Sequence, residues 1–310
     1  MPEIVIAEFM DEAAVAELAA DFDVLYHATL VDQIDALTDA ASGCRALIVR
    51  NRTQVRGPFL EACRQLEVVG RLGVGLDNID LAACEDRGIV VLPAIGANNL
   101  AVAEYVIAGV LMLLRGAYQS SAPVASGEWP RNALIGREMA GARLGLVGFG
   151  GIARETASRA VALGMSVVAH DPHLPDDHPA WSELSVEKVA FDLVLATCDA
   201  VSLHVPLDAT TRHLIDAAAL ARMGKDAVLI NAARGGVVDE PALAAALREG
   251  RLGGAMLDVF ESEPLPGDSL LVEVPNLILT PHIAGVSVES NVRVSTLIAS
   301  KVRDHLRATG

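Results

Sequence analysis

The sequence predicts an α/β protein with two doubly wound parallel sheets, in which one domain is inserted into the other. Three observations support this fold class. The chain has 310 residues, enough for two domains. Hydrophobic residues make up 52% of it and the mean hydropathy is +0.39, so we expect large buried cores. Short apolar runs alternate with helical patterns, as in parallel sheets whose two faces are covered by helices.

The first series of predicted elements ends near residue 93. Its strands are apolar runs such as IVIAEF and RALIVR, expected at residues 4–9, 23–27, 45–50, 66–72 and 88–92. Between them, apolar residues recur at helical spacing over residues 11–20, 31–41, 57–65 and 80–88. Each strand is thus followed by a helix, which is the order that builds a parallel sheet.

A second series follows a long helix that we expect over residues 99–118. Its strands are expected at residues 143–150, 165–171, 193–197, 200–205, 227–233, 253–260 and 277–280. The amphipathic stretch 286–308 predicts a final helix that packs on the first series. We therefore predict a discontinuous substrate-binding domain, residues 1–97 plus 284–310, and an inserted domain, residues 98–283.

Composition and charge exclude several functional classes. The net charge of −16 repels phosphate backbones, so nucleic acid is not an expected partner. The longest apolar stretch, residues 102–114, is too short to cross a bilayer, and the N-terminus lacks a secretory pattern. The four cysteines have no metal-ligand spacing and are typical of reduced thiols. We expect a cytoplasmic protein with no membrane, nucleic-acid or metal partner.

A glycine-rich turn follows the first predicted strand of the inserted domain. The segment GLVGFGGIARETA has the pattern G-x-G-x-x-A at Gly148, Gly150 and Ala153, with a strand before it and a helix after it. Gly148 permits a tight turn, Gly150 lets the backbone approach a pyrophosphate, and Ala153 allows close helix–strand packing. The N–H groups at the helix start, near Gly151 and Ile152, are expected to bind the phosphates. This context predicts a Rossmann domain.

The cofactor choice follows from the next strand, SVVAHD, which ends in Asp171. A carboxylate at this point accepts hydrogen bonds from the adenosine ribose hydroxyls. The segment after it contains no Arg or Lys until Lys188, so a 2′-phosphate would find no cationic partner. The sequence therefore predicts NAD rather than NADP.

Three further strand ends of the inserted domain carry unusual polar residues. Arg234 follows the run VLIN, and His282 follows the run LILT and a proline. Asp258 and Glu263 follow the run GGAM. Because the carboxyl ends of strands in a doubly wound sheet open onto one crevice, we expect these side chains to converge.

Each of these residues suits one task in the oxidation of a 2-hydroxy acid. Arg234 can grip the substrate carboxylate with two parallel hydrogen bonds. His282 can take the hydroxyl proton as the hydride leaves, and Glu263 can hold its ring and favour the imidazolium. Asp258 is interpreted as a partner of the nicotinamide carboxamide or ribose.

The sequence resembles the D-isomer-specific 2-hydroxyacid dehydrogenases, particularly the branch around phosphoglycerate dehydrogenase. The resemblance covers almost the whole chain. It rests on the ordered blocks VVGRLGVGLDNID, the nucleotide turn, SLHVPLDATTRHLI, NAARGGVVDE, LDVFESEPL and TPHIAG. The minor departures are Gly151 and Ala153 in the turn, and Asn51-Arg52 in VRNRTQV.

The resemblance implies a fold and a set of site residues. The fold is a Rossmann NAD-binding domain inserted into a flavodoxin-like substrate domain. The implied catalytic set is Arg234, Glu263 and His282, and Val74 and Gly75 offer N–H groups to the substrate carboxylate. The implied NAD-binding residues are Gly148, Gly150, Gly151, Ile152, Asp171, Val205, Ala232, Arg234, Asp258, His282 and Gly285. A homodimer is also implied, made largely by the cofactor domains with the long helix from Asn99 and the GEWPR loop.

The identity of the substrate depends on the segment VRNRTQV, which places Arg50, Asn51 and Arg52 at a strand end. One or both arginines are candidates to bind a second anionic group on C3, and Asn51 is counted among the substrate-binding residues. This segment and IAEFMDEAAVAEL also resemble the sulfolactate dehydrogenases of the family. The expected reaction is (S)-3-sulfolactate to 3-sulfopyruvate, since this label corresponds to the D configuration. The alternatives are 3-phosphoglycerate, glycerate and lactate.

An alternative from another functional class is an NAD-sensing binding protein. Lost catalytic residues or added interaction segments would favour it, and this chain shows neither. Its acidity also argues against a role on chromatin.

Overall fold

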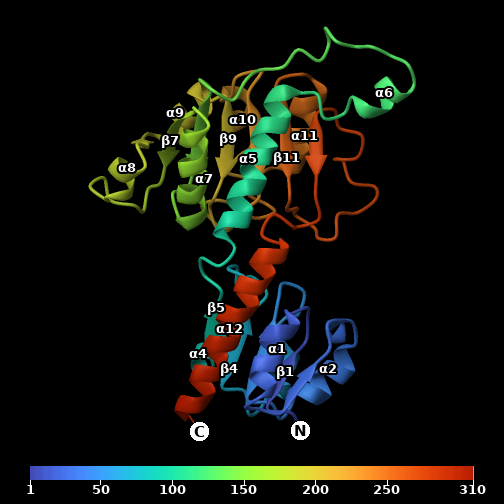
Figure 1. Ribbon diagram of the computed structural model, residues 1–310, viewed down its shortest axis with the longest axis vertical. Coiled ribbons are helices and arrows are strands. Elements are labelled where there is room, and N and C mark those ends of the chain that lie inside the picture. Colours follow the sequence, from blue (N-terminus) through green and yellow to red (C-terminus); the bar gives the residue numbers. More distant parts are fainter. Residues whose placement is uncertain (310) are drawn as a thin grey trace. The chain divides into compact units, whose positions relative to one another are not determined.

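The computed structural model describes residues 1–309 and divides into two compact units (Figure 1). The first unit comprises Met1–Asn98 and the C-terminal segment from Val286, and the second unit comprises Asn99–Gly285. All strand pairs in both units are parallel, which confirms the predicted class of two doubly wound α/β domains.

The first unit contains a five-stranded sheet in the order β2-β1-β3-β4-β5. Its strands are β1 (Ile4–Ile6), β2 (Val24–Tyr26), β3 (Ala46–Val49), β4 (Val68–Arg71) and β5 (Val90–Pro93). The helical elements are α1 (Glu12–Ala19), η1 (Leu30–Asp32), α2 (Ile34–Ala41), α3 (Gly57–Ala62), α4 (Leu81–Asp86) and α12 (Val288–Thr309). Every residue of β1 and β3 is buried, because helices cover both faces of the sheet.

Helix α12 packs on the sheet of the first unit, so the chain returns to this unit at its C-terminal end (Figure 1). The contact is close at Gly70 of β4. A Cβ atom built there would lie 2.7 Å from Ile298 Cγ2 and 2.9 Å from Val302 Cγ2. Ile298 and Val302 are fully buried. A residue without a side chain at position 70 therefore lets the helix approach the strand.

The second unit contains a seven-stranded sheet in the order β12-β11-β10-β9-β6-β7-β8. Its strands are β6 (Arg143–Val147), β7 (Ser166–His170), β8 (Glu187–Lys188), β9 (Ala200–Leu203), β10 (Val228–Asn231), β11 (Gly254–Leu257) and β12 (Leu277–Leu279). The helices are α5 (Asn99–Arg115), α6 (Ser121–Ala125), α7 (Gly151–Ala162), α8 (Ala180–Glu183), α9 (Phe191–Thr197), α10 (Ala217–Arg222) and α11 (Glu240–Arg248).

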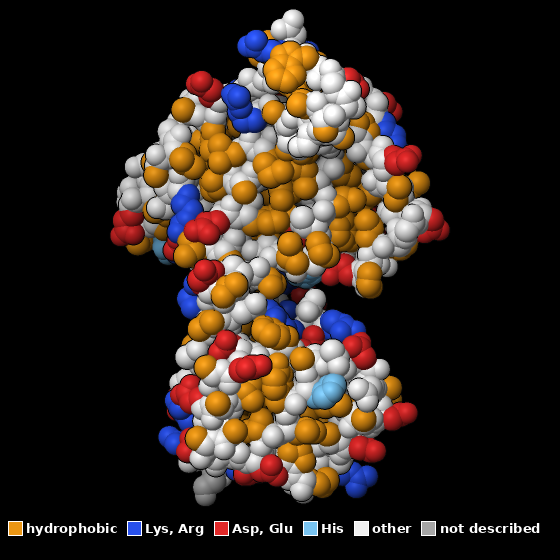
Figure 2. Space-filling view, turned by 45° about the vertical axis from the view of Figure 1, so that its right-hand side comes forward, with side chains coloured by type: hydrophobic (Ala, Val, Ile, Leu, Met, Phe, Trp, Pro, Cys, Tyr) orange, Lys and Arg blue, Asp and Glu red, His pale blue; other side chains and the backbone are white. Residues whose placement is uncertain are grey.

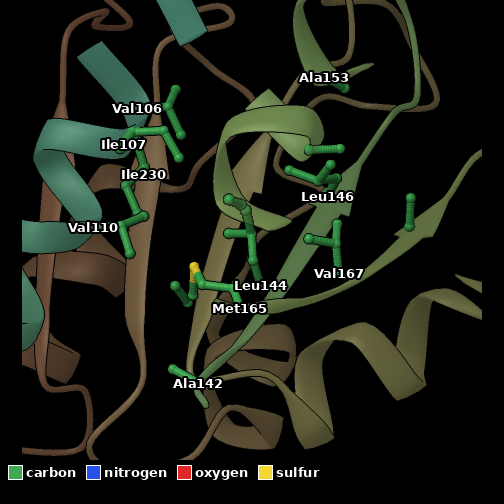
Figure 3. Packing of buried hydrophobic residues seen from close by; sticks show 14 of the residues in the cluster. Val106, Ile107, Val110, Ala142, Leu144, Leu146, Ala153, Met165, Val167 and Ile230 are labelled. Atoms are coloured by element: carbon green, nitrogen blue, oxygen red, sulfur yellow. The ribbon is translucent and has the colours of Figure 1, made fainter. Parts of the chain in front are cut away.

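Two apolar clusters fill the two faces of this sheet. One joins α5 and α7 to the sheet, and Figure 3 shows Val106 and Val110 of α5 near Ile230 of β10, and Leu144 and Leu146 on β6. The other cluster joins the opposite face to α9, α10 and α11. The winding direction changes at β6, because β7 and β8 lie on one side of it and β9 to β12 on the other. Ligands of doubly wound sheets bind at such a switch point.

The predicted strand at residues 193–197 is wrong, because this segment belongs to helix α9. Val194 and Leu195 are buried, whereas Leu193 and Ala196 are exposed, which is the burial pattern of a helix with one face on the sheet. An apolar run of five residues does not distinguish a buried strand from a short buried helix.

None of the helices described over residues 1–309 combines the length and the apolar content that a bilayer crossing needs.

Candidate active site

The glycine-rich turn lies between β6 and α7, at the switch point of the second sheet. Gly148 has φ +88°, and a Cβ atom there would lie 2.6 Å from the carbonyl oxygen of His204, in the segment after β9. Only glycine fits this combination of a left-handed backbone and a close neighbouring strand. Gly150 caps α7 in an extended conformation, and no atom lies within 4 Å of the position its Cβ would take. The turn thus leaves open space at the N-terminus of a helix of 12 residues, which fits a pyrophosphate.

Gly151, at the start of α7, faces the side chain of Asn99. A Cβ atom at position 151 would lie 2.6 Å from Asn99 Nδ2, so the amide fills the place of the missing side chain. Ile152 is half-buried against the apolar cluster under α7, and Ala153 is fully buried in it. The absence of a large side chain at Ala153 is what allows α7 to lie close to the sheet.

The side chain of Asp171, directly after β7, is hydrogen-bonded to the glycine-rich turn. Its Oδ2 accepts a hydrogen bond from Phe149 N at 2.8 Å, and its Oδ1 accepts from His173 N at 2.9 Å and Leu174 N at 3.1 Å. Burial raises the pKa of Asp171, but these backbone donors outweigh burial and lower the pKa below its usual value. The carboxylate is therefore ionised beside the turn, in the state that accepts from ribose hydroxyls.

His282 and Glu263 form a hydrogen-bonded pair in the second unit. The distance between His282 Nδ1 and Glu263 Oε2 is 2.7 Å, and the two side chains are 37% and 32% exposed. Glu263 Oε1 also accepts a hydrogen bond from Phe260 N at 3.1 Å. Within residues 1–309 no hydrogen-bond partner contacts Nε2, the other ring nitrogen of His282. The ring thus has one oriented nitrogen and one available nitrogen, which is the arrangement of a general base.

Glu263 is held in its ionised form by its surroundings. Burial raises its pKa, but the hydrogen bond and charge of His282, the Phe260 N–H and the charge of Arg234 together lower it below the usual value. Arg234 belongs to the segment after β10, and the residue that follows it, Gly235, lies against Phe260, close in the chain to Glu263. Gly235 explains the approach, because a Cβ atom there would overlap the carbonyl oxygen of Phe260, at 1.7 Å.

The structure therefore brings Arg234, Glu263 and His282 together from three strand ends of one sheet. Arg234 Nη1 donates to the carbonyl oxygen of Ala233 at 2.6 Å, and Asn231 Nδ2 donates to the carbonyl oxygen of Arg234 at 2.9 Å. These bonds fix the backbone from which the guanidinium extends. A guanidinium, a carboxylate and an imidazole in one place can bind a carboxylate substrate and exchange a proton with it.

The remaining predicted cofactor residues lie along the same edge of the second sheet. Ala232 directly follows β10, and Val205 lies two residues after β9, with its Cγ1 3.1 Å from the position of a Cβ at Gly148. Gly285 ends the second unit. Asp258 differs from these residues, because it is 1% exposed and its carboxylate accepts hydrogen bonds from the segment that follows β12.

Asn51, Val74 and Gly75 belong to the first unit, after β3 and β4. Asn51 is exposed, and Val74 and Gly75 are half-buried. Over residues 1–309 no group of three or more His, Cys, Asp or Glu side chains is placed to hold a metal ion.

Two residues that were not predicted as functional from the sequence, Glu8 and Asn78, shape the loop of Asn51. Glu8, buried after β1, accepts through Oε1 from Arg50 N at 2.9 Å and Thr53 N at 3.1 Å, and Asn78 Nδ2 donates to the carbonyl oxygens of Arg50 and Thr53. The available signal was an ionisable residue directly after the apolar run IVIA, since a buried carboxylate there needs donors.

Comparisons with known proteins agree with this geometry. A family model described as "D-isomer specific 2-hydroxyacid dehydrogenase, NAD binding domain" matches residues 107–284. The (S)-sulfolactate dehydrogenase of Chromohalobacter salexigens is 58% identical over 304 residues, which cover 98% of each chain. D-3-phosphoglycerate dehydrogenase 3 of Arabidopsis thaliana is 39% identical over 309 residues, and the chain spans about half (52%) of its length. The crystal structure of a D-lactate dehydrogenase from Aquifex aeolicus with NAD and lactic acid superposes with a TM-score of 0.88 at 26% identity, covering 98% of this chain and 96% of that one.

The position of Asp171 predicts a test of cofactor preference. Asp171→Ala removes the carboxylate that we expect to accept from the ribose hydroxyls, so kcat/KM for NAD should fall about tenfold while that for NADP does not. Asp177→Ala, an exposed residue of the same loop, is the matched control. Steady-state kinetics with both cofactors provide the measurement, and an unchanged ratio of NAD to NADP efficiency would mean that the ribose is held elsewhere.

The lowered pKa of Glu263 predicts a pH-dependent contribution to stability. A carboxylate with a lowered folded-state pKa stabilises the fold above its usual value, about 4.3, and this contribution disappears as the pH falls through the lowered pKa. Glu263→Gln should therefore reduce the melting temperature at neutral pH, by an amount that shrinks in acid. Thermal unfolding across this pH range measures the difference in melting temperature between the variant and the wild type, with the exposed Glu61→Gln as control. A difference that does not change with pH would mean that the carboxylate of Glu263 is not stabilised by its surroundings.

Proposed function

The chain belongs to the D-isomer-specific 2-hydroxyacid dehydrogenases, which are NAD-dependent oxidoreductases, and from this premise we propose that it oxidises (S)-3-sulfolactate to 3-sulfopyruvate. The observation that carries the choice of substrate is the likeness to an (S)-sulfolactate dehydrogenase over nearly the full length of both chains, at 58% identity. The half-buried guanidinium of Arg50 and the fixed loop that carries it support a substrate with an anionic group on C3.

The roles that we propose for the site follow from its geometry. Bound NAD supplies the hydride acceptor for the hydrogen on C2. Arg234 binds the substrate carboxylate with two parallel hydrogen bonds and thereby orients C2. His282 Nε2 accepts the hydroxyl proton, so that the C–H and O–H bonds break and a C=O bond forms. Glu263, bonded to Nδ1, keeps the ring oriented and stabilises the imidazolium that results.

The cofactor-binding residues are proposed on the same basis. The open space beside Gly150 and the N–H groups at the start of α7 suit the pyrophosphate, and ionised Asp171 suits the adenosine ribose. Val205, Ala232, Asp258 and Gly285 are proposed to line the remaining length of the dinucleotide.

Arg50 is the cation that we propose for the sulfonate. Arg52 is 57% exposed and paired with Asp32 on the surface, so its charge is already neutralised. The Arg50 guanidinium is half-buried and forms no ion pair within residues 1–309. Its Nη2 donates to Asn291 Oδ1 at 3.0 Å, and the group lies 5.8 Å from the centre of the Phe9 ring. Burial lowers the pKa of Arg50, against the opposing charge of Glu8, which reflects the cost of desolvating a guanidinium. Binding a sulfonate offsets that cost.

The loop around Arg50 supplies further polar groups for an anionic substrate. Glu8 and Asn78 fix residues 50–53 through backbone hydrogen bonds, so the position of Arg50 is set before the substrate binds. Asn51 is exposed in this loop, and Val74 and Gly75 are proposed to donate backbone N–H groups to the substrate.

A second candidate substrate is 3-phosphoglycerate, favoured by the 39% identity to a phosphoglycerate dehydrogenase. It shares with sulfolactate a carboxylate, a C2 hydroxyl and an anionic group on C3. Lactate carries no such group, and glycerate carries only a hydroxyl.

We also propose a homodimer formed through the second unit. Exposed hydrophobic residues occur on α5, where Leu111 and Met112 are 40% and 37% exposed, and in the segment after it, where Trp129 and Ile135 are 74% and 79% exposed. Figure 2 shows hydrophobic side chains gathered on this unit. An exposed apolar area of this kind is typical of an interface.

The compartment that we propose is the cytoplasm. All four cysteines are buried free thiols, as expected in a reducing environment. Cell fractionation of the native host tests this, and recovery in an extracellular or periplasmic fraction would contradict it.

The substrate proposal predicts the outcome of a kinetic panel. The kcat/KM for (S)-sulfolactate should exceed those for 3-phosphoglycerate, glycerate and D-lactate, and His282→Ala should reduce kcat about 100-fold or more with any of them. A higher efficiency with 3-phosphoglycerate would replace the proposed substrate by the second candidate.

Arg50 and Arg52 form a matched pair of variants on the same panel. Arg50→Ala should reduce kcat/KM for sulfolactate about 10- to 100-fold, because it removes hydrogen bonds to a charged group, and should leave D-lactate unaffected. Arg52→Ala should leave both substrates unaffected. Equal losses for sulfolactate and lactate would show that Arg50 does not contact the sulfonate.

The dimer proposal predicts that a charge at Trp129 disrupts assembly. Trp129→Glu should convert a dimer into a monomer of 32.4 kDa by light scattering, whereas Ile34→Glu, at an exposed position of the first unit, should not. A wild-type protein that is monomeric at micromolar concentration would contradict the proposed homodimer.

A further inference from the structure

The turn that carries His282 is wrapped around a single residue, Asp258. His282 N donates to the Asp258 carbonyl oxygen at 2.8 Å, Ile283 N donates to Oδ1 at 2.8 Å, and Ala284 N donates to Oδ2 at 2.7 Å. Three successive backbone N–H groups of the turn therefore donate to one residue, one to the backbone carbonyl of Asp258 and two to its carboxylate. The bonds fix the direction in which the His282 side chain leaves the backbone.

His282 has a backbone conformation that needs such support. Its φ is +55°, in the left-handed region that costs free energy for a residue with a side chain. Backbone strain of this kind persists only where the surrounding structure fixes it. The hydrogen bonds to Asp258 are the contacts that hold residues 282–284 in this shape.

Asp258 is enclosed by the turn that it organises. It is 1% exposed, its Oδ1 accepts two hydrogen bonds and its Oδ2 accepts one. A buried carboxylate without donors would be strongly destabilising, so the turn and the carboxylate depend on each other.

A hydroxyl chain connects this carboxylate to helix α5. Thr280 Oγ1 donates to Asp258 Oδ1 at 2.6 Å, and the Tyr105 hydroxyl lies 2.5 Å from Thr280 Oγ1. Because the single Thr280 proton is used on Asp258, Tyr105 is the donor to Thr280. Burial raises the pKa of Tyr105, which keeps its hydroxyl protonated for this role. Tyr105 belongs to α5, which packs on the sheet of the second unit.

We propose that Tyr105, Thr280 and Asp258 are positioning residues for His282. The hydrogen bonds connect the turn of residues 282–284 to helix α5, which is packed on the sheet, and so hold the turn in one position. The position of the turn sets the distance between the imidazole and the substrate hydroxyl. This inference rests on the proposed role of His282 as the proton acceptor.

The test removes one hydroxyl at a time from the full-length protein. Thr280→Val and Tyr105→Phe each delete a link, and Thr280→Ser keeps the hydroxyl. The matched control is Tyr118→Phe, because the Tyr118 hydroxyl is buried with no hydrogen-bond partner in the described part of the chain. The measurements are kcat and the primary deuterium isotope effect, the Kd for NAD by fluorescence, and amide hydrogen exchange of residues 283 and 284 without substrate.

Thr280→Val should reduce kcat about 10- to 100-fold, as expected for a misplaced acid–base group, and should raise the isotope effect. Its Kd for NAD should equal that of the wild type, and the amides of Ile283 and Ala284 should exchange faster. Tyr105→Phe should produce the same changes to a smaller extent. Thr280→Ser and Tyr118→Phe should resemble the wild type.

Two results would overturn the inference. A Kd for NAD that rises in step with the loss of kcat would mean that the substitution acts through cofactor binding and not through the position of His282. An unchanged kcat in Thr280→Val, with or without faster amide exchange, would mean that the chain does not position His282. Failure of sulfolactate as a substrate is distinguishable from both, because the exchange and NAD measurements need no substrate and kcat can be followed with any 2-hydroxy acid that is turned over.

Discussion

Buried or half-buried carboxylates at strand ends, each bonded to the backbone N–H groups of a loop, are the interaction on which the candidate sites of this protein depend. Glu8 after β1, Asp171 after β7 and Asp258 after β11 each accept two or more such bonds. An ionised side chain loses its water on burial and must find donors nearby. The loops supply them, and in doing so they adopt one shape. The same hydrogen bonds therefore stabilise the buried charge and fix the conformation of the loop.

This arrangement separates the residues that we propose touch the ligands from those that hold them. His282 and Arg50 have exposed or half-buried side chains, and the glycine-rich turn has open space beside Gly150. Each is held by a carboxylate that accepts hydrogen bonds from the backbone of the same loop. A loop that already has its bound shape loses less conformational entropy when a ligand arrives, so part of the ordering cost is met during folding. Acidic residues are used in this way although the chain already carries a net charge of −16.

Some predictions were possible from sequence because their physical signals are local. Strand–helix alternation gave the two parallel sheets, and the spacing of Gly148 and Gly150 between a strand and a helix indicated the dinucleotide fold. The signal failed at residues 193–197, where five apolar residues fit a strand and a helix equally well and only packing on the sheet selects the helix. No sequence pattern indicated Asn78, whose partners Arg50 and Thr53 lie far from it in sequence.

The sequence by itself determined the fold class, the family and a dinucleotide-binding domain, because these depend on periodicity and on short motifs whose residues are close along the chain. The tertiary structure decided which arginine of VRNRTQV is half-buried, and it showed that Asp258 lies inside the His282 turn. Both are questions of burial and of hydrogen-bond partners many residues apart. Such partners are fixed only when strands from different parts of the chain align in one sheet, which no short pattern encodes.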